Sequence, residues 1–330
     1  MARLRFAPMK QVPPGLWRRV PPAIFPPLLG LCALALAWDV ATGLLGLPVG
    51  PAGFLSGAVA AMAALAYLAY GVKLCRRPAV LVEELAILPG RAGVAAGVLS
   101  VYLAAAMLGL YSPMLGRLVL VIGLGLHGVL VVLLVRILRQ SPPEQQRVNP
   151  VWHLSFTGFI VAARVALLLG WPGLATLLFW PMLAVGLAIY ALSAQQFRAG
   201  PMPPPPLRPM LAIHLAPLAL FGMVAEGLGF DALAWGFALL ALAGVFVGVA
   251  RARWLLAGGM SPFWGALTFP LAATASLWVT LLGAGGGTLV HGIAALLLVL
   301  ATLVDLPIAY LIWRDWARGH LPVKTNAAIA

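Results

Sequence analysis

The feature that most constrains this chain is a series of ten apolar runs, each about as long as a membrane-spanning helix. A helix needs about 20 apolar residues to cross the hydrocarbon core of a bilayer. Such runs must be helical, because backbone polar groups cannot stay unpaired in lipid. We therefore predict an all-α polytopic membrane protein. The ten expected spans are 24–45, 50–72, 91–111, 114–138, 151–170, 173–195, 209–228, 231–252, 263–284 and 290–312.

Composition supports this prediction and excludes other classes of protein. Hydrophobic residues make up 63% of the chain and charged residues only 9%, whereas a soluble domain carries about 25% charged residues. So few charges cannot cover the surface of a water-soluble globule, which argues against a soluble enzyme. No catalytic motif stands out either. The links are short, so successive spans are expected to pair as five helical hairpins around a central pore.

Basic residues predict the orientation of the hairpins. Of the 21 Lys and Arg residues, 19 lie before the first span, in the links after even-numbered spans, or in the C-terminal tail. The positive-inside rule then places both termini in the cytoplasm, and this distribution in short loops argues against a nucleic-acid partner. We expect a basic arm over 1–20, a membrane domain over 21–317 and a short tail over 318–330. Glu83 and Glu84 fall in a cytoplasmic link and are expected to be solvated.

The odd-numbered spans share a pattern of helix-breaking residues. Each begins at a proline and carries a second proline or a glycine about two turns later. A proline in the first turn costs little, whereas one two turns in removes a hydrogen bond and kinks the helix. Kinked helices at matching points of internal repeats suggest a transport path, although Pro and Gly are also common in membrane helices generally. The expected kink residues are Gly30, Gly97, Gly158, Pro217 and Pro270.

Three segments resemble a known family of transport proteins. Residues 261–273, with Trp264 and the string Thr268-Phe269-Pro270, resemble the ninth helix of the tellurite-resistance/dicarboxylate transporter family. Residues 207–217 are similar to its seventh helix and residues 21–27 to the opening of its first. The family includes bacterial TehA and the plant guard-cell slow anion channels. The resemblance covers about 20–317, and the short tails here leave out the phosphorylated regulatory termini of the plant members.

The resemblance implies a function and an architecture. It implies an anion channel or transporter of the bacterial inner membrane, often a homotrimer, with the odd helices lining a pore and no cofactor. Phe269 would project into the pore and occlude it, whereas its position alone, beside Pro270, favours a residue that packs against a neighbouring helix. The partners would be small inorganic or carboxylate anions and the lipid bilayer. Tellurite, chloride, nitrate, dicarboxylate and sulfite all stay open.

Arg164 is the most informative polar residue, because an ionisable group at membrane depth is costly. Three interpretations stay open: it lines the outer pore and attracts anions, it pairs with Glu226 or Asp39, or it snorkels to the outer headgroups. Asp305 lies in the tenth span, where we expect it to bond a freed backbone group or a partner side chain. Its role is expected to be structural.

The histidines offer a weak case for a metal site. His153 and His214 lie near the cytoplasmic starts of spans five and seven, and we expect them to face each other across a vestibule. Neither has a second ligand one turn away, so we predict no metal site. His127 and His291 are expected to be packing residues.

Two rival functions remain. A coupled metabolite exporter built as two halves would need an inverted repeat between 1–170 and 173–330, whereas the sequence shows parallel hairpins. A membrane haem or nitric-oxide response protein would reveal itself by haem absorbance.

Overall fold

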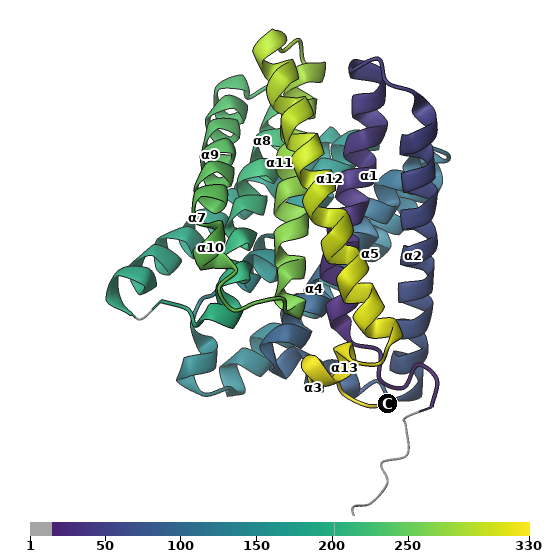
Figure 1. The fold of residues 1–330 in the computed structure, drawn as a ribbon, viewed down its shortest axis with the longest axis vertical. Helices are drawn as coiled ribbons and strands as arrows, with labels where there is room; N and C mark the ends of the chain where they lie inside the picture. Colours follow the sequence, from purple (N-terminus) through teal and green to yellow (C-terminus); the bar gives the residue numbers. More distant parts are fainter. Residues whose placement is uncertain (1–14, 201) are drawn as a thin grey trace, which may run out of the picture.

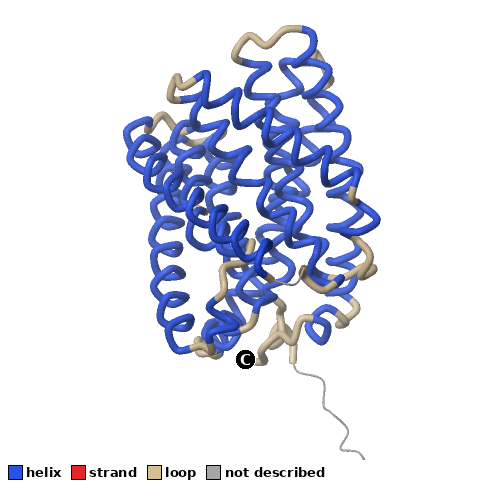
Figure 2. Tube along the Cα trace, turned by 90° about the vertical axis from the view of Figure 1, so that its left-hand side faces the viewer, coloured by secondary structure: helices blue, strands red, loops and turns tan. Residues whose placement is uncertain are grey.

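The computed structural model describes residues 15–200 and 202–330, and within these residues the chain is all helix and loop (Figures 1 and 2). Residues 1–14 of the expected N-terminal arm lie outside the described part. Each predicted hairpin is present. The ten long elements are α1 (Phe25–Leu44), α2 (Val49–Arg76), α4 (Leu88–Gly109), α5 (Pro113–Gln140), α6 (Phe159–Leu168), α7 (Pro172–Ala199), α8 (Leu215–Gly227), α9 (Asp231–Ala250), α11 (Thr268–Gly283) and α12 (Thr288–Ala317).

Short elements connect or precede these helices. Three of the 3₁₀ segments run directly into a long helix, and each has a proline in its first turn, where the missing N–H costs little. The short elements are η1 (Pro22–Ile24), α3 (Val80–Ala86), η2 (Pro143–Gln146), the π-helical η3 (His153–Thr157), η4 (Pro205–His214), α10 (Ala252–Leu255), η5 (Pro262–Leu267) and α13 (Leu321–Lys324).

Nine of the ten expected spans are long and apolar enough to cross a membrane in the described part of the chain. The fifth, predicted over 151–170, is the exception: its continuous helical segment, His153–Leu168, is shorter than the other nine. It combines a π-helical turn with α6, and Gly158 joins the two with helical backbone angles. The prediction of an all-α polytopic membrane protein is therefore confirmed, with one span shorter than expected.

The five hairpins form a closed ring. The first helices of the hairpins contact one another in chain order, α1 with α4, α4 with α6, α6 with α8 and α8 with α11, and α11 returns to α1. Each second helix packs on its own partner: α2 on α1, α5 on α4, α7 on α6, α9 on α8 and α12 on α11. We call α1, α4, α6, α8 and α11 the inner helices and the other five the outer helices.

Burial separates the two sets. In the four inner spans that are long enough to cross a membrane, between 61% and 72% of the most apolar stretch is buried. In the outer spans the buried share of that stretch is 22% to 39%. The outer helices leave large apolar side chains exposed, such as Phe54 and Phe246. Exposed apolar surface of this extent is stable only in contact with lipid or another protein chain.

Close approach between α1 and α11 closes the ring. A Cβ atom at Gly30 would overlap both the Thr268 side chain and the Phe269 backbone, so only glycine allows this packing. The Thr268 hydroxyl donates to the Pro26 and Gly265 carbonyls, at 3.2 and 2.9 Å. The inner interface thus follows the general rule that small residues let membrane helices pack backbone to backbone.

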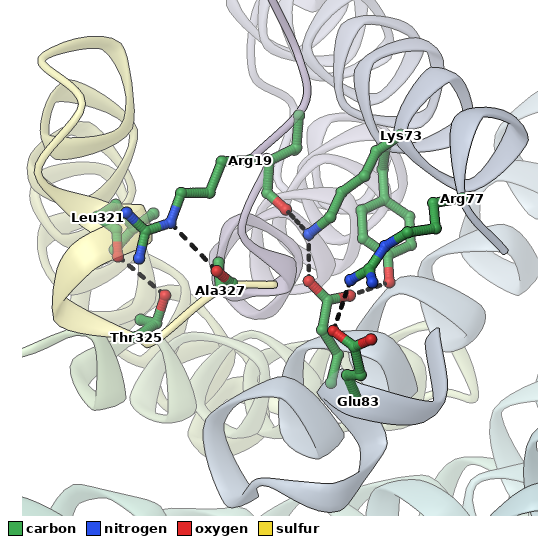
Figure 3. A network of polar contacts seen from close by, with 10 residues as sticks. Arg19, Lys73, Arg77, Glu83, Leu321, Thr325 and Ala327 are labelled. Carbon is green, nitrogen blue, oxygen red and sulfur yellow. Dashed lines mark hydrogen bonds and ion pairs between the residues drawn. The ribbon is translucent and has the colours of Figure 1, made fainter. Parts of the chain in front are cut away.

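The end of the ring that carries both described chain ends contains a buried ion pair (Figure 3). Lys73 of α2 pairs with Glu84 of α3, and both side chains are inaccessible to solvent. The ammonium of Lys73 also donates to the Val20 carbonyl at 2.7 Å, and the Tyr70 hydroxyl donates to Glu84 at 2.6 Å. Glu83 is half-exposed and pairs with Arg77 at 2.6 Å. The expectation that Glu84 is solvated was therefore wrong, because α3 packs against α4 and α5 and brings Glu84 to Lys73 at the end of α2.

The tail over 318–330 packs onto the same end. Leu321 and Ala327 are buried, the Arg19 guanidinium donates to the Ala327 carbonyl at 3.1 Å, and the Ala330 amide donates to Arg18 at 2.8 Å. Figure 3 shows this contact beside the buried ion pair. Burial raises the pKa of the Glu84 carboxyl, while the facing Lys73 ammonium acts to lower it.

Candidate functional site: the axis of the inner ring

Two cavities lie along the axis of the ring. The proximal cavity, about 40 Å³ in volume, lies where the inner spans begin, and every inner span contributes to its wall. Its lining is almost wholly apolar. The residues that represent the five spans are Pro26, Pro89, Leu154, Ile213 and Phe263.

The distal cavity lies toward the C-terminal ends of the inner helices and is larger, about 170 Å³. All five inner helices line it as well. Its wall carries polar groups that the proximal cavity lacks, namely the side chains of Arg164, Asp39, Ser276 and Thr280. A cavity of this size holds several water molecules or a small hydrated ion.

Phe269 lines both cavities and also a third, smaller one beside His153 and Gly158. Its side chain is 5% exposed. It is the second residue of α11, which directly follows the 3₁₀ turn η5, and it stands directly before Pro270. The local sequence positions it there because Pro270 removes one backbone donor at the point where the chain changes from 3₁₀ to α geometry.

The five expected kink residues occupy two kinds of position. Gly158 separates η3 from α6, while Pro217 and Pro270 are each the third residue of an α-helix that follows a 3₁₀ segment. Gly30 and Gly97 lie inside unbroken helices, where a side chain would meet Thr268 and the Phe25 ring respectively. Helix geometry therefore changes at or next to three of these residues. At the other two, the glycine allows close contact with a neighbouring helix.

Arg164 lies on the wall of the distal cavity and is partly buried. One guanidinium nitrogen donates to the Thr280 hydroxyl at 3.2 Å. Neither Glu226 nor Asp39 forms an ion pair with it within the described part of the chain. Asp39 instead accepts from the Ser56 hydroxyl at 2.8 Å. This geometry favours the cavity-lining interpretation over the ion-pair interpretation.

Sequence reasoning missed Ser276 and Thr280. These residues are one turn apart on α11, and each hydroxyl donates to the carbonyl four residues earlier, at 2.8 and 2.9 Å. This internal bonding leaves the Thr280 oxygen free to accept from Arg164. A hydroxyl at positions i and i+4 of an odd span was the available signal, since such residues in membrane helices commonly face a polar interior.

His153 and His214 face each other as predicted, with 3.0 Å between His153 Nε2 and His214 Nδ1. The Tyr190 hydroxyl donates to the His214 carbonyl, and His153 lies 3.4 Å from the Thr157 hydroxyl. Across residues 15–200 and 202–330, no three His, Cys, Asp or Glu side chains come together in a group that could hold a metal ion.

Two further polar residues are buried among the helices. His127 of α5 bonds the Tyr102 hydroxyl at 3.0 Å and the Ser155 carbonyl at 2.9 Å and stacks on Phe159, which is a packing role as expected. Asp305 of α12 is fully buried, and neither carboxylate oxygen has a hydrogen-bond partner among the described residues. The expected partner for Asp305 is therefore not found.

The ring of hairpins with cavities on its axis defines a polytopic helical membrane protein of the channel or transporter type. Residues 19–312 match the SLAC1 family, described as voltage-dependent anion channels, and the chain belongs to that family. The match extends over nearly all of the ring and confirms the resemblance found in the sequence. Among curated proteins, none matches this sequence.

Proposed function

We propose that this protein carries small anions along the axis of the inner ring and that Phe269 closes the path. Membership of the anion channel family supports the class of function. The observation that carries the proposal is the position of Phe269, which lines both the proximal and the distal cavity. An aromatic side chain between two cavities can block flow both by its volume and by excluding water from the constriction.

Arg164 supplies the anion preference in this proposal. Among the described residues it is the one cationic side chain that lines the distal cavity, and it bonds the neutral Thr280 hydroxyl. The distal wall also carries Asp39, whose carboxylate accepts from the Ser56 hydroxyl on outer helix α2. The described lining of the proximal cavity contains no charged side chain. In this proposal Arg164, and not Asp39, faces the ion, and a positive charge in a mostly apolar path favours anions over cations through electrostatics at short range.

The remaining parts of the proposal rest on the sequence. The basic bias of the links supports cytoplasmic termini, and the family resemblance supports a homotrimer in a bacterial inner membrane. The exposed apolar outer helices leave room for both lipid and neighbouring subunits. Flux measurements with different anions, including tellurite and dicarboxylates, will identify the anion that is carried.

Removal of the Phe269 ring tests the proposal directly. Phe269→Ala should raise anion flux into liposomes by about tenfold or more, because Ala266 and Ala273 on either side are too small to fill the space. The preference for anions over cations should change little, since no charge is altered. Phe54→Ala is the matched control, because Phe54 is exposed on outer helix α2. Unchanged or lower flux, together with a loss of stability typical of a core Phe, would contradict the proposal.

A further inference from the structure

A further cavity, larger than those on the axis, lies on the outer surface of the ring. It is a groove of about 450 Å³ lined by η4 and α8, by α9 and α10, and by α11 and α12. Figure 1 shows where helices α8 to α12 lie. Its wall is almost entirely apolar, and two of the α9 valines that border it, Val247 and Val249, are exposed. No acidic residue lines it among those that the structure describes. We call it the outer groove.

The end of the outer groove nearest the described chain ends carries basic and aromatic residues. Arg251, the residue that follows α9, lines the groove and is exposed. Within the described part of the chain it forms no ion pair. Trp254 also lines the groove, and it is fixed by Arg208, whose guanidinium lies 4.4 Å from the centre of the Trp254 ring and donates to its carbonyl at 3.2 Å.

We propose that the outer groove binds one anionic phospholipid, with an acyl chain along the apolar wall and the phosphate on Arg251. The groove is lined in part by α9 and α12, two helices long and apolar enough to cross a membrane, and acyl chains are the solvent around such helices. Tryptophan marks the headgroup level in membrane proteins, and Trp254 lies beside Arg251. An unpaired arginine at that level attracts the negatively charged lipids of the cytoplasmic leaflet.

The bound lipid would support the start of α11. The inner wall of the groove is formed by Leu267, Pro270 and Leu271, which flank Phe269 on the same turn. An acyl chain in the groove would therefore press on the side of α11 opposite the axis and hold the η5–α11 junction in place. This consequence rests on the proposed function, whereas lipid binding itself does not.

A pair of glycines on α9 provides a matched test of the acyl-chain site. Gly248 lines the groove and Gly236 does not, and a Cβ atom at either position would meet open space. Gly248→Leu should fill the groove without disturbing the fold, and Gly236→Leu is the control. The measurement is native mass spectrometry of protein taken from vesicles of phosphatidylcholine and phosphatidylglycerol. Wild type and Gly236→Leu should retain phosphatidylglycerol, and Gly248→Leu should lose it.

A pair of arginines tests the headgroup site. Arg251→Gln should lower the preference for phosphatidylglycerol over phosphatidylcholine by about fivefold, the contribution of one basic residue at a membrane surface. Arg253→Gln is the control, because Arg253 is exposed and does not line the groove. Equal retention by all four variants would overturn the proposal. A change of oligomeric state in Gly248→Leu with retention unchanged would also overturn it, because the groove would then be a contact between subunits.

Anion flux separates this inference from the proposed function. In liposomes with and without phosphatidylglycerol, the flux of wild type should differ and that of Gly248→Leu should not. Loss of lipid binding without any change in flux would overturn the support of α11 by lipid, while the binding site would stand. Failure of Phe269→Ala to raise flux leaves the binding measurement unaffected.

Discussion

The inner and outer helices are similar in composition but differ in what surrounds them. Both sets are apolar along their length, yet 61–72% of the most apolar stretch of each long inner span is buried against 22–39% in the outer spans. All inner spans except that of α4 change helical geometry near their beginnings, and inner helices pack through glycines. Four of the five outer helices are longer than any inner helix, at 28 to 30 residues. The comparison shows that in lipid the arrangement of helices is set by small and helix-breaking residues, because hydrophobicity alone does not distinguish inside from outside.

One residue on an outer helix, Lys73, is buried as fully as the inner helices are, and its replacement should have the largest effect on stability. Lys73 lies near the end of α2 and is fully buried against Glu84. Lys73→Met should lower the free energy of unfolding by about 3–5 kcal/mol, because it leaves a buried carboxylate without its partner. Chemical unfolding in mixed micelles provides the measurement. The double variant Lys73→Met/Glu84→Leu should recover much of the loss, and a double variant as unstable as the single one would contradict this account.

The same variant should acquire a specific pH dependence. Burial raises the pKa of Glu84 above its ordinary value of 4.5, and without Lys73 nothing charged opposes that rise. A carboxyl with a raised pKa binds more protons in the folded state, so stability is greatest at low pH and falls as the pH rises through the raised pKa. The melting temperature of Lys73→Met should therefore fall more steeply above pH 4.5 than that of Glu84→Gln.

Glycine-to-alanine substitutions test the difference between inner and outer helices, and we expect them to have an intermediate effect on stability. Gly30→Ala adds one methyl group at the α1–α11 contact, where it overlaps Thr268 and backbone, and should cost about 1–3 kcal/mol. Gly53→Ala adds the same group to outer helix α2, where nothing lies within reach, and should be neutral or gain up to about 1 kcal/mol from helix propensity. Equal effects in thermal melts would refute the distinction between inner and outer glycines.

Arg164 should have the smallest effect, on flux and not on folding. Arg164→Gln removes the charge from the distal cavity while keeping a group that can bond Thr280. We expect anion flux in the Phe269→Ala background to fall by about tenfold, equivalent to about 1.4 kcal/mol, with an unchanged melting temperature. If flux is unchanged as well, Arg164 does not face the permeating ion.

Most of the fold was predictable from the sequence, for physical reasons that also explain the errors. Span positions follow from the length of apolar runs, and the inner set follows from prolines and glycines at matching offsets. The fifth span is shorter than expected, and its π-helical turn at His153–Thr157 leaves no hydropathy signal. The burial of Glu84 was not predictable, because it depends on how α3 packs against α4 and α5 and brings Glu84 to Lys73.

The sequence predicted which residues belong to the site better than it predicted which residues they contact. Arg164, Phe269 and His153 line cavities on the axis or beside it, because each stands on an inner span, whereas His214 lines the outer groove. Their partners come from distant spans, 116 residues away for Thr280 from Arg164 and 61 for His214 from His153. Such contacts depend on helix rotation and depth, which periodicity specifies poorly in a helix that is apolar on every side. Asp305 belongs to the same category, and nothing in the structure explains its unpartnered carboxylate.

The central claim is that anions pass along the axis of the inner ring, and a thiol on the distal cavity wall tests it most directly. In a Phe269→Ala background with Cys75 replaced by serine, Ser276→Cys should react with a charged, membrane-impermeant thiol reagent added on the distal side. The added group should then block the path. Thr288→Cys, at the exposed start of outer helix α12, is the control. The account predicts that anion flux is lost in Ser276→Cys and unchanged in Thr288→Cys, although both are labelled. Full labelling of Ser276→Cys with undiminished flux would contradict it.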